Sequence, residues 1–121
     1  MGGQMRVLIA YGDSHRSYGE TLEAALRGMR PGAEVSLVRA EELGDGVARL
    51  DPHLVVSDRP NGVDPGGPAA WARIPADPDE PSEFCVGGRR RRLTNPDFRE
   101  LLRAFDEAEE MVRDGRAPGV C

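Results

Sequence analysis

Two groups of polar residues hold the side chains of this sequence that could bind a ligand or take part in a reaction. Each group follows a short apolar run, and together they comprise Tyr11, Asp13, Ser14, Ser57, Asp58, Arg59 and Asn61. Carboxylates such as Asp13 and Asp58 can hold a divalent cation, and an exposed aspartate can also attack a phosphoryl group. We expect these residues to form one ligand or partner face, provided that the fold brings the two groups together.

The apolar runs before these groups predict neighbouring parallel strands. Residues 6–10 and 54–57 contain the continuous apolar stretches 7–10 and 54–56 and are bounded by turn signals, which is typical of strands buried on both faces. A strand over 34–38 and helices over 17–29 and 40–50 complete a β-α-β-α-β order. This order predicts a flavodoxin-like, three-layer α-β-α fold with parallel strands in the spatial order 2-1-3. The first and third strands then flank the switch point of the sheet, where ligands bind.

Helix ends are indicated by capping residues. Ser17 has capping-box spacing to Glu20, which predicts that it caps the first helix. Asn95 is a good N-cap, and the apolar stripe behind it predicts a C-terminal helix over 95–115 that buries Phe98, Leu102 and Phe105.

Residues 59–93 break the alternation of strand and helix. Prolines and glycines recur over 59–82, so no helix fits between the apolar stretches 71–74 and 83–86. Their connection is too short for a parallel crossover, so these stretches pair antiparallel or lie apart. Gly87 and Gly88 favour a hairpin over 83–93. We therefore predict an irregular or hairpin segment in place of the fourth strand and helix.

Length and composition restrict the class of protein. The chain has 121 residues, the size of one domain, and a formal net charge of −5, which argues against nucleic acid or an anionic membrane as the main partner. Two cysteines without ligand spacing do not indicate a metal site. No apolar run is long enough to span a bilayer and no export signal is recognisable, so we expect a cytoplasmic protein.

The segments Arg6–Ala10 and Pro52–Asp58 resemble the first and third strands of a response-regulator receiver, a CheY-like domain of bacterial signal transduction. The resemblance covers residues 5–60 and the final helix. It implies that Asp58 occupies the position of the phosphoacceptor aspartate. It also implies a Mg²⁺ ion held by an acidic pair after the first strand, a lysine near the fifth strand, and a switch Ser or Thr after the fourth.

The sequence departs from that pattern at several positions. Tyr11 and Gly12 stand where the acidic pair is expected, and Asp13 could join Asp58 as a Mg²⁺ ligand only if the loop shifts by one residue. All 16 basic residues are arginine, so the family's lysine is missing. No strand–helix unit carries a switch Ser or Thr. We therefore predict a degenerate receiver with no bound cofactor and no catalytic residue.

Three classes of function follow from these observations. The first is a non-catalytic, phosphorylation-independent signalling or interaction module with a protein partner, for which a homodimer is one form. The second is a working receiver that accepts phosphate on Asp58. The third is a small-ligand binder or enzyme that uses the crevice after the first and third strands. The arginine run 89–92 is interpreted as a solvated hairpin, since strand residues alternate between faces.

Overall fold

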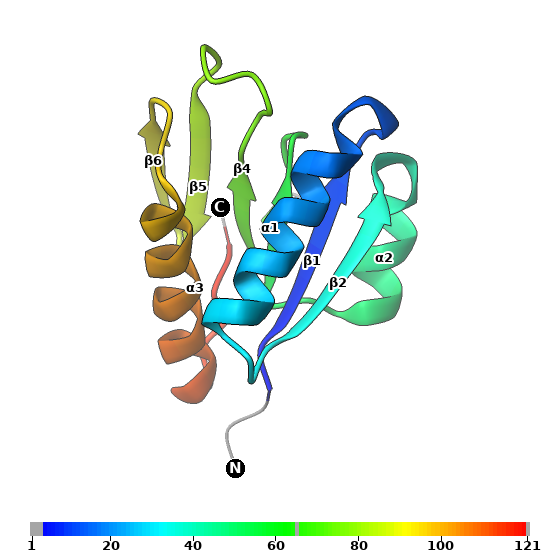
Figure 1. The fold of residues 1–121 in the computed structure, drawn as a ribbon. Helices are drawn as coiled ribbons and strands as arrows, with labels where there is room; N and C mark the ends of the chain where they lie inside the picture. The colour runs from blue at the N-terminus through cyan, green and yellow to red at the C-terminus, as the bar shows by residue number, and fades with distance from the viewer. Residues whose placement is uncertain (1–3, 65, 121) are drawn as a thin grey trace.

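The computed structural model describes residues 4–64 and 66–120. Over these residues the chain forms one six-stranded sheet in the order β2-β1-β3-β4-β5-β6, with three α-helices (Figure 1). The elements in chain order are β1 (Arg6–Tyr11), α1 (Arg16–Met29), β2 (Glu34–Arg39), α2 (Leu43–Leu50), β3 (Leu54–Ser57), β4 (Ala70–Arg73), β5 (Ser82–Val86), β6 (Arg89–Leu93) and α3 (Phe98–Arg113), and short 3₁₀ turns at Asp13–His15 and Ala40–Glu42 precede α1 and α2.

The first half of the sheet is parallel, and the predicted 2-1-3 order is confirmed. β1 pairs with β2 on one side and with β3 on the other, so Leu8 lies between Ser36 and Val55. All four residues of β3 are buried, which explains why its sequence is continuously apolar up to Ser57. This parallel core fits a flavodoxin-like arrangement and aligns the carboxyl ends of β1 and β3.

The second half of the sheet is antiparallel. β4 adds to β3 in parallel, but β5 returns antiparallel to β4, and β5 and β6 form the predicted hairpin. In the described part of 59–93 no helix is present, as expected. The prediction that this segment also replaces the fourth strand is wrong, because β4 occupies the position of a fourth parallel strand beside β3. Residues 74–81, which connect β4 to β5, contain Pro75, Pro78 and Pro81. These prolines and the short connection exclude the helical crossover that a parallel fifth strand would need.

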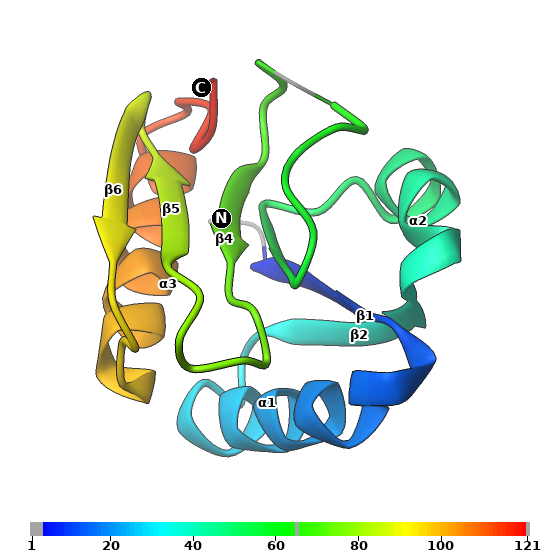
Figure 2. The same ribbon diagram turned by 90° about the horizontal axis from the view of Figure 1, so that it is seen from above.

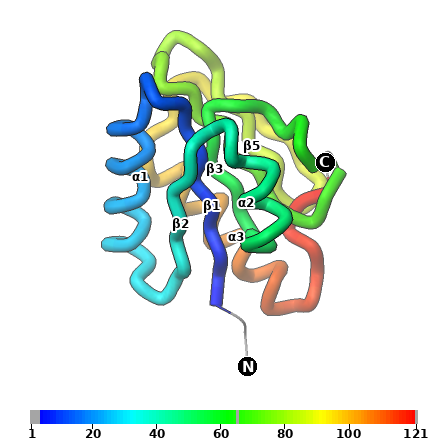
Figure 3. Tube along the Cα trace, turned by 90° about the vertical axis from the view of Figure 1, so that its right-hand side faces the viewer, coloured from blue at the N-terminus to red at the C-terminus, as the bar shows by residue number. Residues whose placement is uncertain are grey.

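Helices cover the two faces of the sheet unequally. α1 and α3 pack on one face, around Ile9, Leu26 and Phe105, and α2 packs on the opposite face over β1 and β2 (Figure 1). Figure 3 shows α1 and α2 on opposite sides of β1 and β2. In the described chain, the α2-side face of β5 and β6 is therefore left without a helix. The described residues of the segment between β3 and β4 lie between β4 and α2 (Figure 2).

Two predicted helix starts are wrong. α3 begins at Phe98, and its N-cap is Asp97, whose side chain accepts a hydrogen bond from the Glu100 N–H at 3.3 Å. Asn95 instead adopts a left-handed conformation with φ of 46°, so it turns the chain before the helix. α1 begins at Arg16 after the 3₁₀ turn, which places Ser17 inside the helix, where its carbonyl accepts from the Thr21 hydroxyl.

The C-terminal tail ties the hairpin to the segment before β4. The Gly87 and Gly88 N–H groups donate to the Pro118 and Gly119 carbonyls at 2.6 and 2.9 Å. Gly119 in turn donates to the Pro68 carbonyl at 2.9 Å, and a side chain there would collide with the Ala69 carbonyl. The tail therefore needs glycine at this position to lie so close to the backbone.

Phe105 tests the packing of α3 on the sheet. Its side chain is 1% exposed and belongs to the larger apolar cluster. We expect Phe105→Ala to lower the free energy of unfolding by about 3–5 kcal/mol, because it removes buried apolar surface and leaves a cavity. Urea denaturation measures this change, and a loss below about 1 kcal/mol would contradict the packing shown here.

His53 makes the stability dependent on pH. Its Nδ1 accepts a hydrogen bond from the Arg6 N–H at 2.9 Å, and burial and the Arg6 charge lower its pKa below the ordinary 6.5. Below about pH 6.5 the histidine of the unfolded chain binds a proton more readily than His53 of the folded chain. The free energy of unfolding therefore decreases as the pH is lowered.

His53→Asn keeps an acceptor and removes this titration, so we expect a shallower loss of stability between about pH 7 and 5. His15→Asn is the matched control, since it removes the chain's other, exposed histidine. Equal slopes for wild type and His53→Asn in denaturation curves would contradict the role of His53.

Candidate functional site

The structure brings part of the predicted face together at the carboxyl ends of β1 and β3. Arg59 follows β3, and its Nη2 lies 4.0 Å from the point where a Cβ on Gly12 would sit, so its side chain reaches across to the end of β1. Asp58 lies near Tyr11, the last residue of β1, since its charge contributes to the raised pKa of Tyr11. The two groups of polar residues therefore meet through Tyr11, Gly12, Asp58 and Arg59.

The chain turns immediately after Ser57. The buried Ser57 hydroxyl accepts a hydrogen bond from the Arg59 N–H at 3.0 Å, and the Arg59 carbonyl accepts from the Trp71 indole N–H at 3.1 Å. This turn brings the Arg59 Nε to 3.9 Å from the Asp58 Oδ1, although consecutive residues of a strand would point to opposite faces. Trp71 thus holds the turn that pairs Asp58 with Arg59.

Asp58 is a largely buried carboxylate with an unsatisfied oxygen. Its side chain is 15% exposed, and its Oδ1 has no hydrogen-bond partner. A buried acceptor without a donor is costly, and the guanidinium of Arg59, itself 62% exposed, compensates only part of that cost. Asp58 is therefore the one predicted site residue, among those described, with a buried side-chain atom that lacks a hydrogen-bond partner.

Tyr11 is part of the core and not of an open site. Its hydroxyl donates to the Ile74 carbonyl at 2.7 Å, and its ring meets that of Tyr18 edge-on with centroids 5.3 Å apart. Burial raises its pKa strongly, with smaller contributions from Tyr18 and Asp58. The hydroxyl therefore stays protonated and bound to the backbone.

Asp13 and Ser14 lie in the 3₁₀ turn and do not join Asp58. The Asp13 Oδ2 accepts from Arg39 at the end of β2 at 3.2 Å, and Ser14 is exposed. Among the residues that the structure describes, no three His, Cys, Asp or Glu side chains gather as they would around a metal ion. With the Asp13 carboxylate and the Tyr11 hydroxyl both engaged elsewhere, this arrangement does not fit the Mg²⁺ site of a receiver.

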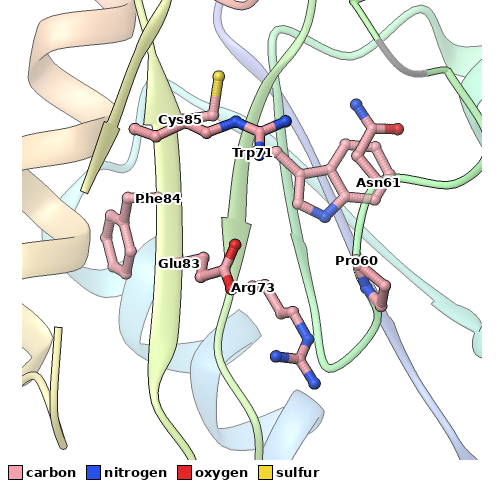
Figure 4. A pocket seen from close by; sticks show the side chains of 8 residues that line it. Pro60, Asn61, Trp71, Arg73, Glu83, Phe84 and Cys85 are labelled. Atoms are coloured by element: carbon pink, nitrogen blue, oxygen red, sulfur yellow. The ribbon is translucent and has the colours of Figure 1, made fainter. Parts of the chain in front are cut away.

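A separate cleft lies on the face of β4 and β5 that α2 leaves uncovered (Figure 4). It has a volume of about 140 Å³ and is lined by Pro60, Asn61, Trp71, Arg73, Glu83, Phe84, Cys85 and Arg90. Of the predicted site residues only Asn61 lines it, and the Asn61 side chain is bonded to the backbone of Asp64 at 2.9 and 3.0 Å. The structure thus divides the predicted face between two places.

Arginine supplies the polar chemistry of this cleft. The Arg73 Nη2 lies 3.7 Å from the exposed Glu80, whereas its buried Nε has no hydrogen-bond partner. Cys85 is not a free thiol, so the cleft offers no thiol nucleophile. Sequence reasoning missed Trp71, Arg73 and Arg90 because they come from two strands, β4 and β6, that are separated in the sheet by β5. Only the alternation of Trp71 with Arg73 hinted at a shared face.

Comparison with protein-family models, with curated proteins and with solved structures finds no match to this chain. No helix in the described chain is long and apolar enough to cross a membrane. The fold and the site geometry are therefore the basis for assigning a function.

Asp58→Asn tests the bonding of the buried carboxylate. We expect it to keep the free energy of unfolding or raise it by up to about 1 kcal/mol, because it removes a charge that has no donor. Asp13→Asn, in an exposed pair, should change stability by less than about 0.5 kcal/mol. Chemical denaturation measures both variants. A loss above about 1 kcal/mol for Asp58→Asn would mean that the carboxylate stabilises the fold.

Proposed function

We propose that this protein is a non-catalytic, phosphorylation-independent, receiver-like interaction module that acts through a protein partner in the cytoplasm. The observation that carries the proposal is the pairing of the two strand-end carboxylates with separate arginines. Asp13 pairs with Arg39 at 3.2 Å, and Asp58 lies 3.9 Å from Arg59. Each acid is thus next to a cation of the chain itself instead of sharing a metal ion with the other.

This pairing works against receiver chemistry for an electrostatic reason. Phosphoryl transfer to an aspartate depends on a metal ion and fixed cations that neutralise the phosphoryl charge. A single nearby carboxylate gives a weak Mg²⁺ site. Arg59 offers a planar, delocalised guanidinium charge where the receiver family uses the compact ammonium charge of lysine. The low exposure of Asp58, 15%, further limits access to a phosphodonor.

A working receiver is the second candidate, and the unsatisfied Oδ1 of Asp58 favours it. The end of a central parallel strand is a usual position for a binding site. A cation bound there, or a phosphoryl group attached there, would interact with the oxygen that now lacks a donor. The two candidates predict opposite results with a phosphodonor.

Incubation with acetyl phosphate and Mg²⁺ distinguishes them. We expect no added phosphate by intact-mass spectrometry, and no shift in the thermal midpoint with Mg²⁺ and beryllium fluoride, because no bound metal ion or lysine would compensate the charge of an incoming phosphoryl group. Asp58→Asn is the matched control and should likewise show no added phosphate. A stoichiometric gain of one phosphate that Asp58→Asn abolishes would make the protein a functional receiver.

A further inference from the structure

The arginines of this chain are almost all paired, and the exceptions are not scattered. Of its 16 arginines, all within the described residues, only Arg49, Arg90 and Arg92 form no ion pair. Two of these three lie two residues apart on β6. In a chain with a net charge of −5, unpaired arginines side by side are a local departure from the overall balance.

The arginines of β6 differ according to the face on which they lie. Arg89 and Arg91 point toward α3, where they pair with Glu107 at 3.4 Å and Glu100 at 3.9 Å. Arg91 also lies over the Phe84 ring, 5.9 Å from its centroid. Because strand residues alternate, Arg90 and Arg92 point to the opposite face, which no helix of the described chain covers.

The strand register gathers further groups beside these two arginines. Cys85 of β5 lies between Arg90 and Trp71, and Glu83 lies between Arg92 and Arg73. This arrangement places three arginines and one glutamate in two adjacent rows. With Glu80 beside Arg73 included, the face still carries a net positive charge. We call it the β4–β6 face and define it by Trp71, Arg73, Glu83, Cys85, Arg90 and Arg92.

The cleft in the β4–β6 face is small. Its volume of about 140 Å³ is close to the roughly 150 Å³ of a cavity that takes up one benzene molecule, and is well below the size of a typical small-molecule site. It therefore suits one side chain of an extended segment better than a whole metabolite. Among the cleft residues, Trp71 supplies an apolar wall and Arg73 a guanidinium with an unsatisfied donor.

We propose that the β4–β6 face binds an extended acidic segment of a protein partner, with one carboxylate side chain in the cleft at Arg73 and neighbouring carboxylates on Arg90 and Arg92. The proposal rests on the proposed function as an interaction module, and it specifies the surface and the chemistry of the partner. Charge complementarity selects the acidic partner, because arginine forks bind carboxylates in a bidentate geometry.

Arginines on an outer strand also protect a sheet edge from pairing with other chains. That role treats both faces of β6 alike, since any charge along the edge opposes association. Binding of an acidic segment instead depends on Arg90 and Arg92 and not on Arg89 and Arg91. The two faces therefore give matched variants with the same strand and the same change in net charge.

Trp71 is the chain's only tryptophan and lines the cleft, so its fluorescence reports binding at this face. The probe is a synthetic peptide of alternating glutamate and threonine, titrated into the full chain at low ionic strength. We expect a saturable change in Trp71 fluorescence that weakens as salt is added. Arg90→Ser/Arg92→Ser should weaken binding about tenfold or more, and Arg90→Lys/Arg92→Lys should recover part of the loss.

Arg89→Ser/Arg91→Ser is the control and should bind the peptide within about twofold of the wild type, since its arginines face α3. Circular dichroism confirms that each variant is folded. Equal weakening by both pairs would show that net charge alone is responsible and would overturn the proposal. A glutamine–threonine peptide that binds equally well, free glutarate that binds as tightly as the peptide, or no fluorescence change at all would also overturn it.

The peptide experiment and the phosphodonor experiment test different claims, so either claim can be rejected without the other. A peptide that does not bind, together with an unphosphorylated Asp58, rejects the β4–β6 face and leaves the interaction module in place. An acyl phosphate on Asp58 rejects the phosphorylation-independent function whatever the peptide does.

Discussion

The short, proline-containing connection between β4 and β5 is the constraint on which the second half of the structure depends. Residues 74–81 cannot form a crossover helix, so β5 returns antiparallel and the hairpin β5–β6 extends the sheet. A parallel strand would have brought a helix with it to cover one face. Here α3 covers one face only, and no helix among the described residues covers the other face of β5 and β6. The same connection therefore explains both the mixed sheet and the exposed arginines.

Electrostatic pairing inside the chain determines what the strand-end residues can do. The structure places Asp13 with Arg39 and Asp58 with Arg59, and the Tyr11 hydroxyl with the Ile74 carbonyl. These contacts satisfy most of the groups that a ligand or metal ion would use at the switch point. The exception is the Asp58 Oδ1, whose lack of a hydrogen bond is tolerated because Arg59 lies nearby and the preceding strand β3 is fully buried.

The Trp71 indole connects the two regions that sequence reasoning treated as one face. Its N–H holds the Arg59 carbonyl at 3.1 Å, and its ring forms a wall of the cleft on β4. Trp71 therefore holds the turn after Ser57 and also forms part of the cleft. Asn61 lies beyond that turn and lines the cleft, which is why the polar residues after β3 separate instead of forming one site.

Local patterns in the sequence were enough to predict the parallel core, the hairpin and the apolar stripe of α3, because burial on both faces, Gly-Gly turns and helical periodicity are written in neighbouring residues. They did not locate the helix starts, since Asn95 and Asp97 are both good caps and only the path of the chain determines that Asp97 caps α3.

The candidate site was predicted less well. Asp58 and Arg59 could be named in advance, but the pairing of Asp13 with Arg39 depends on where β2 ends beside β1. The β4–β6 face joins side chains from three strands, and whether each arginine meets a glutamate depends on which face α3 covers. Such contacts between distant residues are decided only by the tertiary structure, because the energy of an ion pair depends on distance in space and not on separation along the chain.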